Sequence, residues 1–411
     1  MAVQPPPERF RDVLEACAQG FGAPRFSDAS AEREQTVWEL DRAWVVEDDG
    51  RYVATATSYA FEMTVPGGTR VPAGGVAQVA VLPTHRRRGH LRDVMGAVLA
   101  QSAELGEHYA ILNASDSGIY GRFGFGQADR VLRIELDADH VELVVPTAPG
   151  RIRLVDAHEA APLLAGLYDR FGRDRPGAVG RSAAWWNLVL HDEASWRGIG
   201  NPFVAVHEDE TGEPDGYAVY RSNEHWDRGH ANGTVEVREL EAATSAVEAG
   251  LWRFLCDIDL RTRVVAYPRP SDDPIRWRLS RPRRAWVTET LDLLWVRPLD
   301  VAACLAGRRY AVEETLVLAI SDETRPDQAG PYRVTGGPDD ASAERVDDTP
   351  DLSLDVAVLG SVILGGIDAG ELASAGRITE HTDGAAARAD RFFRWRPPFL
   401  QHHLLIARFG A

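Results

Sequence analysis

The segment 75–99 restricts the possible folds of this chain more than any other. The apolar run Gly75–Leu82 has the composition of a buried strand, and a short turn follows it. Beyond the turn, apolar residues recur at the spacing of an amphipathic helix: Leu91, Val94, Met95, Val98 and Leu99. A buried strand that leads directly into an amphipathic helix indicates a mixed α/β architecture.

The turn between this strand and this helix is strongly basic. It contains Arg86, Arg87 and Arg88, followed by Gly89. The N–H groups at a helix N-terminus carry a partial positive charge, and glycine allows the backbone to approach a ligand closely. We therefore predict a cradle for a pyrophosphate, with a solvated basic turn as the alternative. The turn has no G-x-G-x-x-G pattern, so it is not a dinucleotide fingerprint.

Strand and helix patterns divide the chain into three expected domains. The first, residues 1–145, begins with helices at Arg9–Ala18 and Gln35–Ala43 and ends at the linker VPTAPG. Its expected strands are Ala43–Glu47, Tyr52–Val65, Gly75–Leu82, Tyr109–Asn113 and Val131–Leu136.

The second expected domain, residues 146–288, repeats the order of strand and helix in degenerate form. The strand Thr234–Leu240 precedes the helix Ser245–Asp257, but Glu239 and Glu241 replace the arginines and the glycine. This acidic connection would repel a pyrophosphate. The third domain, residues 289–411, carries strands and small helices. The expected fold class is therefore α/β with mixed sheets of the α+β kind.

The chain contains no lysine, because every one of its 45 Lys+Arg residues is arginine. A phosphate loop of the Walker A type, a protein-kinase active site and Schiff-base chemistry each require a lysine amine. These three classes of mechanism are excluded.

Charge and cysteine content restrict the partners and the compartment. The formal net charge of −17 disfavours nucleic acid and anionic membranes. It is compatible with a cationic substrate, and the alternative is that the charge only keeps a soluble oligomer in solution. The three cysteines form no C-x-x-C pair, which is typical of the cytoplasm. We found no membrane span, no signal peptide and no motif for a metal.

Two motifs together resemble the Eis (enhanced intracellular survival) family of GCN5-related N-acetyltransferases. The first is PTHRRRG followed by LR, in which Leu91 stands where the wider superfamily has Gly or Ala. The second is S-x-x-x-I-Y-G-R-F-G-F-G, Ser115–Gly126. The resemblance implies two tandem acetyltransferase-like domains, the second degenerate, and a C-terminal domain like sterol carrier protein, to which residues 359–378 are similar.

The resemblance also implies acetyl-CoA as co-substrate and no metal. The acidic connection in the second domain predicts one acetyl-CoA per chain. The strand backbone would bind the pantetheine arm, and the basic turn would bind the pyrophosphate. The implied coenzyme-binding residues are Val79, Ala80, Val81, Arg87, Arg88, Gly89, His90, Leu91, Arg92, Ser115 and Asp116.

The resemblance implies two catalytic groups. Tyr120 would be the general acid, since a tyrosine with a reference pKa of about 10 can protonate a thiolate whose conjugate acid has a pKa of about 8.5. The carboxylate of the C-terminal residue, Ala411, would act as the base. The alternative for Tyr120 is an aromatic side chain that only packs within its turn. The alternative for Ala411 is a frayed chain end without a catalytic role.

The expected function is acetyl-CoA-dependent N-acetylation of primary amines on polycationic compounds such as aminoglycosides, polyamines or lysine side chains. Asp28, Trp38 and Glu62 are candidates for binding the cationic amine. A hydrophobic-ligand carrier and a CoA-binding sensor without turnover are the alternatives. A homo-oligomer, a hexamer by resemblance, is expected.

Overall fold

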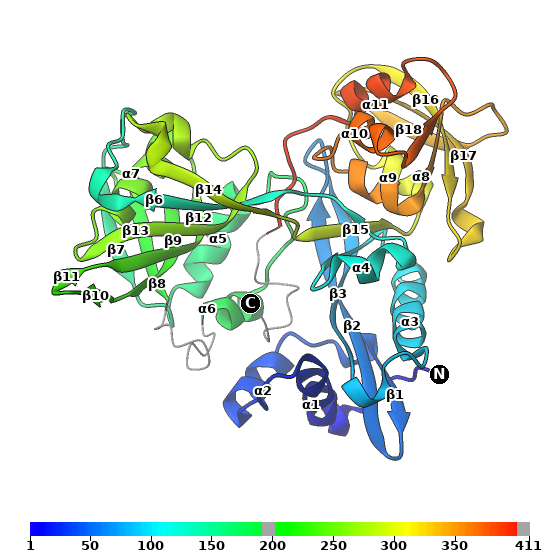
Figure 1. The fold of residues 1–411 in the computed structure, drawn as a ribbon, viewed down its shortest axis with the longest axis horizontal. Helices are drawn as coiled ribbons and strands as arrows, with labels where there is room; N and C mark the ends of the chain where they lie inside the picture. Colours follow the sequence, from blue (N-terminus) through cyan, green and yellow to red (C-terminus); the bar gives the residue numbers. More distant parts are fainter. Residues whose placement is uncertain (191–201, 401–411) are drawn as a thin grey trace. The chain divides into compact units, whose positions relative to one another are not determined.

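The chain forms two compact units in the computed structural model, which describes residues 1–190 and 202–400 (Figure 1). The first unit contains residues 1–129, 175–179 and the chain from 292 onward, and the second contains residues 130–174 and 180–291. The first unit therefore combines the two ends of the sequence.

A mixed sheet with the order β1-β2-β3-β4-β15-β5 forms the centre of the first unit. These strands are β1 (Ala43–Asp48), β2 (Arg51–Thr64), β3 (Arg70–Val81), β4 (Tyr109–Asn113), β15 (Leu294–Pro298) and β5 (Gly126–Gln127). The meander β1-β2-β3 is antiparallel, whereas β3 and β4 are parallel. A helical crossover is therefore needed between β3 and β4.

The crossover is helix α3 (His90–Glu104), at the position that the apolar spacing predicts. Its residues Val94, Met95, Val98 and Leu99 pack against the sheet in one buried core. Helix α1 (Phe10–Phe21) contacts β2 and β3. The short helix α4 (Ser117–Tyr120) follows β4.

The prediction of a helix at Gln35–Ala43 is wrong. Helix α2 instead spans Asp28–Gln35 and begins after Ser27, whose side chain accepts a hydrogen bond from the backbone N–H of Ser30. The apolar side chains that suggested a later helix, Val37 and Trp38, are buried in an irregular connection.

The C-terminal part of the first unit has its own sheet with the order β18-β17-β16-β19-β20. Its strands are β16 (Glu314–Ser321), β17 (Gly330–Gly336), β18 (Ala341–Arg345), β19 (Leu352–Asp355) and β20 (Ile378–Glu380). Its helices are α8 (Val301–Ala306), α9 (Val356–Val362), α10 (Ala369–Ser374) and α11 (Ala385–Phe393). Helix α9 packs on β15 and β5, which joins this part to the central sheet.

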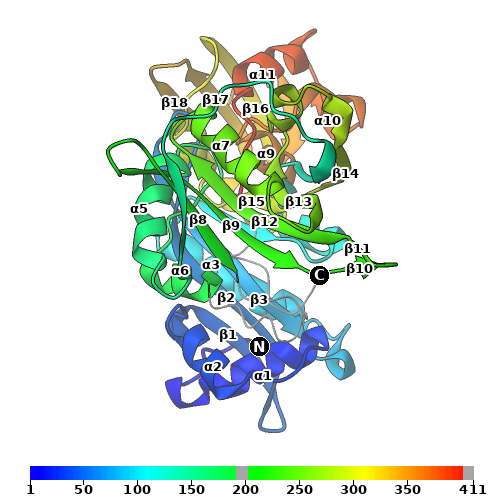
Figure 2. The ribbon, with the colours of Figure 1, turned by 90° about the vertical axis from the view of Figure 1, so that its left-hand side faces the viewer.

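The second unit contains a sheet with the order β14-β6-β13-β12-β9-β8-β7, several strands of which lie side by side in Figure 2. The strands are β6 (Val131–Asp137), β7 (Arg151–Val155), β8 (Phe203–Glu208), β9 (Pro214–Asn223), β12 (Gly233–Ala242), β13 (Arg261–Pro270) and β14 (Ala285–Leu291). A small ribbon, β10 (Trp226–Asp227) and β11 (His230–Ala231), adjoins them in sequence.

Alternating side chains give this sheet two buried faces. One core includes Ala218 and Tyr220 with helix α7 (Ser245–Cys256). The other includes Tyr217 and Val219 with helices α5 (Ala161–Phe171) and α6 (Ala183–Leu190).

The two acetyltransferase-like halves exchange strands. We expected Val131–Leu136 to end the first domain, but as β6 it pairs with β13 and β14 in the second sheet. In return β15, from the far end of the second half, lies between β4 and β5 in the first sheet. Its start is held by Asp129, whose carboxylate accepts hydrogen bonds of 2.9 Å from the N–H groups of Leu293 and Leu294.

No helix in the described residues is long and apolar enough to cross a membrane.

Gly126 tests the packing of β5 against α9. A Cβ at Gly126 would lie 1.8 Å from the carbonyl oxygen of Ala357. We expect Gly126→Ala to lower the free energy of unfolding by about 1–3 kcal/mol, as overpacking does. The matched control is Gly121→Ala, since a Cβ at Gly121 meets no atom within 4 Å. Urea unfolding of both variants checks the prediction, and equal stabilities would contradict it.

Candidate active site

A cavity of about 1320 Å³ lies in the first unit, bordered by β3, α3 and α4 and by residues near β15. It is larger than the roughly 300–1,000 Å³ that is usual for small-ligand sites. The described residues that line it include six arginines, Arg86, Arg87, Arg92, Arg122, Arg297 and Arg325, but only two carboxylates, Asp116 and Glu104. This balance favours an anionic ligand, although the chain as a whole is acidic.

One wall of the cavity is a strand edge that β4 leaves unpaired. Among the described residues, β3 pairs with β4 only from Ala73 to Gly75, although β3 continues to Val81. Val79, Ala80 and Val81 all line the cavity. On the side away from β2, the backbone of this segment is thus open to an extended ligand that adds as a strand, although the carbonyl of Val81 accepts a 3.5 Å hydrogen bond from Arg86.

A bulge in β3 turns this part of the strand. Gln78 has a φ of +54°, and the register with β2 shifts between Thr55 and Thr57. The hydroxyl of Thr55 donates a 2.8 Å hydrogen bond to the carbonyl of Gln78, and the thiol of Cys17 lies 3.1 Å from its Oε1. Bulges re-aim strands next to active sites, and here α1 and β2 hold the bulge in place.

The basic turn forms the second wall. Arg87 has a φ of +64° and Gly89 a φ of +89°, so the backbone curls before α3 begins at His90. No side chain of the described residues caps this helix, so its first N–H groups face the cavity without an intrahelical acceptor. The turn and the helix N-terminus have the geometry of an anion-binding cradle.

The arginines of this turn differ in placement. Arg86 donates a 3.1 Å hydrogen bond to the carbonyl of Gly20 in α1 and ties the turn to that helix. Arg87 and Arg92 are exposed and line the cavity together with Gly89, His90 and Leu91. Arg88, which the sequence also suggests, is not among the described residues that line it.

Tyr120 lies on the third wall at the end of α4, with Ser115 and Asp116 also lining the cavity. Its ring is buried and packs edge-on against Phe125 at 6.2 Å between ring centroids. Burial raises the pKa of the Tyr120 hydroxyl above its usual value, and a hydrogen bond with Ser115 opposes this shift in part. Tyr120 therefore stays protonated at neutral pH and can donate a proton into the cavity.

The three residues suggested for binding an amine lie elsewhere. Asp28 is exposed and pairs with Arg11 at 2.8 Å, and Glu62 is exposed on β2. Trp38 is buried against the rings of Phe10 and Tyr59. None of the three is among the described residues that line the cavity, and their role stays a prediction.

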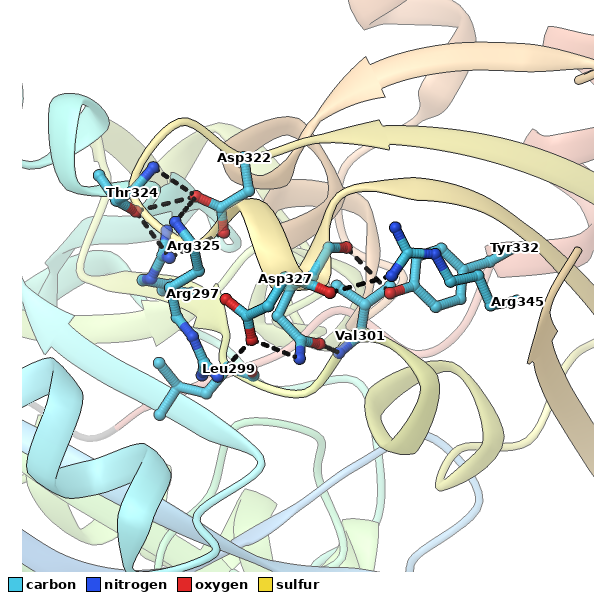
Figure 3. A network of polar contacts seen from close by, with 10 residues as sticks. Arg297, Leu299, Val301, Asp322, Thr324, Arg325, Asp327, Tyr332 and Arg345 are labelled. Carbon is cyan, nitrogen blue, oxygen red and sulfur yellow. Dashed lines mark hydrogen bonds and ion pairs between the residues drawn. The ribbon is translucent and has the colours of Figure 1, made fainter. Parts of the chain in front are cut away.

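Sequence reasoning missed the part of the wall that comes from the C-terminal region. Arg297 on β15 lines the cavity, and so do Thr324 and Arg325. The one local signal is an arginine inside an otherwise apolar strand, Leu293–Val296 followed by Arg297. Its guanidinium is fully buried and bonds Asp322 at 2.8 Å and Thr324 at 2.9 Å (Figure 3).

Gly124 of the second motif makes room for this guanidinium. Its φ is +81°, and a Cβ there would lie 1.5 Å from Nη1 of Arg297. The F-G-F-G pattern therefore serves the contact with β15 and α9, because Gly126 touches α9 in the same way.

Comparisons with known proteins agree with this architecture. Residues 5–128 and 177–298 each match a family model described as acetyltransferase (GNAT) domain, and residues 301–401 match a sterol carrier protein domain. The chain is 33% identical over 392 residues to the N-acetyltransferase Eis of Mycobacterium tuberculosis, with 91% of this chain and 92% of the relative covered. It belongs to the Eis family of GNAT N-acetyltransferases.

Further relatives support the same assignment. An uncharacterized N-acetyltransferase of Streptomyces coelicolor is 39% identical over 360 residues, which cover 87% of this chain and 86% of the relative. The crystal structure of Eis1 from Mycobacterium abscessus superposes with a TM-score of 0.86 at 32% identity and covers 98% of this chain and 99% of that one. The expected fold, two GNAT domains followed by a sterol-carrier-like domain, is confirmed, and the chain is an N-acetyltransferase.

The Arg297–Asp322 pair gives a stability prediction. Both side chains are almost fully buried, at 1% and 2% exposure. Removal of one charge would therefore leave the other charge buried without a partner. We expect Arg297→Met to lower the free energy of unfolding by about 3–5 kcal/mol. Arg333→Gln, which removes a partly exposed arginine paired with Glu344 and Asp348 on the same C-terminal part, should change the melting temperature little, because exposed ion pairs contribute little to stability. Equal melting temperatures for the two variants would contradict the prediction.

Proposed function

We propose that this Eis-family enzyme transfers the acetyl group of acetyl-CoA to primary amines of small polycationic acceptors within the cavity of the first unit. The observation that supports this most is that one cavity brings together the unpaired edge of β3, the basic turn and the hydroxyl of Tyr120. These three features match the needs of an extended arm, a diphosphate and a leaving thiolate.

The residues present fit acetyl-CoA. Val79–Val81 would bind the pantetheine arm through their backbone. The turn residues Arg87–Arg92 would hold the diphosphate, with Arg88 the one member that does not line the cavity. Ser115 and Asp116 would lie beside the arm. In the second unit, the connection between β12 and α7 contains neither an arginine nor a glycine, and Glu239 is buried within β12 in an ion pair with Arg181 at 2.8 Å, so we propose one coenzyme per chain.

The bound thioester supplies the acetyl group and the thiolate that leaves. As the amine nitrogen bonds to the carbonyl carbon and the carbon–sulfur bond breaks, Tyr120 gives its proton to the sulfur. A backbone N–H of the bulged part of β3 would stabilise the carbonyl oxygen. The proton that the amine loses would pass to the carboxylate of Ala411, a residue that lies outside the described residues.

The acceptor class rests on charge. A net charge of −17 attracts polycations, aminoglycosides and polyamines among them. The interior of the C-terminal part is packed with aromatic rings, Tyr310 and Phe392 being stacked at 3.8 Å, which supports a scaffolding role over lipid carriage. A homo-oligomer, a hexamer by resemblance, and a cytoplasmic location stay predictions.

Tyr120→Phe tests the general acid. Phenylalanine keeps the ring packing on Phe125 but removes the proton, so we expect kcat to fall about 10²–10⁴-fold. The assay follows free thiol during incubation with acetyl-CoA and a panel of aminoglycosides, polyamines and lysine peptides. Calorimetry should show unchanged coenzyme affinity. Unchanged turnover would remove Tyr120 from the mechanism, and the absence of thiol release from every amine would contradict the proposed function.

The pH profile gives a second test. The pKa of Tyr120 is raised above the ordinary tyrosine value of 10.0. Tyr120 therefore stays protonated below this raised pKa and is lost as a proton donor only above it. We therefore expect no decline of kcat caused by Tyr120 between about pH 7 and 10. A decline with an apparent pKa below 10 that disappears in Tyr120→Phe would contradict this expectation.

A further inference from the structure

A group of four residues in the C-terminal part, which we call the loop cluster, forms a second polar region at the cavity. It consists of Arg297, Asp322, Thr324 and Arg325 (Figure 3). Arg297, Thr324 and Arg325 line the same cavity as the basic turn of α3. Neither Asp322 nor Asp327 is among the described residues that line it. The cluster therefore presents hydrogen-bond donors to the cavity, whereas its one carboxylate, that of Asp322, does not line it.

The cluster is rigidly built. Asp322 Oδ1 accepts hydrogen bonds from the backbone N–H groups of Thr324 and Arg325, both at 3.0 Å, and from the Thr324 hydroxyl at 2.8 Å. Its Oδ2 accepts from Arg297. The carboxylate thus closes the turn that carries Thr324 and Arg325 and fixes it to β15.

The guanidinium of Arg325 is oriented by two acceptors. It donates a hydrogen bond of 2.8 Å to the carbonyl of Leu299 and one of 2.9 Å to the carboxylate of Asp327. Arg325 stays partly exposed, with 27% of its side chain accessible. An arginine held in this way loses little side-chain freedom on binding and suits a phosphate.

The guanidinium of Arg297 has hydrogen-bond donors that are not used. Within residues 1–190 and 202–400, its Nε and Nη1 have no hydrogen-bond partner, although its side chain is 1% exposed. A buried guanidinium with unused donors is costly unless a ligand or water satisfies it. Burial also lowers the pKa of Arg297, although the carboxylate of Asp322 opposes this shift.

We propose that the loop cluster binds a phosphate monoester, the 3′-phosphate on the ribose of coenzyme A. This inference rests on the proposed function and assigns the C-terminal part a direct role in coenzyme recognition. Coenzyme A carries two separate phosphate groups, a diphosphate and a ribose 3′-phosphate. The α3 turn offers backbone N–H groups in a curled segment, which suits the diphosphate. The loop cluster offers side-chain donors alone and takes the monoester, with Arg325 as the direct contact and Arg297 as the positioning residue.

The test compares CoA with 3′-dephospho-CoA on the full-length wild-type protein. Calorimetry should show that dephospho-CoA binds roughly tenfold to a hundredfold more weakly than CoA, because the charge-assisted hydrogen bonds to the 3′-phosphate are lost. In turnover, the KM for the acetylated form of dephospho-CoA should rise by the same factor, and kcat should stay constant. Equal dissociation constants for the two coenzymes would overturn the proposal.

Arg325→Gln assigns the effect to the cluster. It should weaken binding of CoA to the level of dephospho-CoA and leave binding of dephospho-CoA unchanged. Arg333→Gln removes the same charge from the same part of the chain, away from the cavity, and should keep the full preference for CoA. Weakening of both coenzymes by the same factor in Arg325→Gln would overturn the assignment. If Arg325→Gln does not fold, the wild-type comparison still decides whether the 3′-phosphate is recognised.

The outcomes separate this inference from the proposed function. A preference for CoA without thiol release from any amine would leave the subsite standing and remove the acetyltransfer to amines. Turnover of an amine without any preference for CoA over dephospho-CoA would support the acetyltransfer to amines and remove the 3′-phosphate subsite.

Discussion

The pairing of β15 between β4 and β5 is the constraint on which the rest of the first unit depends. On one side it completes the central sheet, and on the other it carries the C-terminal part to that sheet through α9. Without β15, β4 would lose a partner along its whole length, and the cavity would lose Arg297. The completeness of the central sheet and the lining of the cavity are therefore linked through one short strand that lies far in sequence from the basic turn and Tyr120.

The chemistry of the cavity follows from two departures from regular structure. The bulge at Gln78 and the early end of the β3–β4 pairing leave backbone groups that no neighbouring strand within residues 1–190 and 202–400 satisfies. An unpaired strand edge is normally a liability, and a ligand that adds as a strand removes it. Burial of Tyr120 near this edge raises the pKa of its hydroxyl, which suits the role of general acid that we propose for it.

Local patterns predicted much of this site, because their causes are local. The spacing of apolar residues in 91–99 placed α3, and the arginines with Gly89 placed the basic turn. The prediction failed where contacts are distant. Burial of Val37 and Trp38 in a connection imitated a helix, and the exchange of β6 for β15 has no signature in either strand. β6 alternates apolar and charged residues and β15 is mostly apolar, and the partners of both strands depend on the whole sheet.

The sequence by itself determined the strand–turn–helix cradle, the position of Tyr120 in a glycine-rich turn and the exclusion of lysine chemistry, since each depends on residues close in the chain. Only the tertiary structure decided that Arg297, Thr324 and Arg325 share the cavity with that cradle. The reason is physical: a buried arginine shows its role only through Asp322 and the space left by Gly124, and these residues meet only after the sheet is complete.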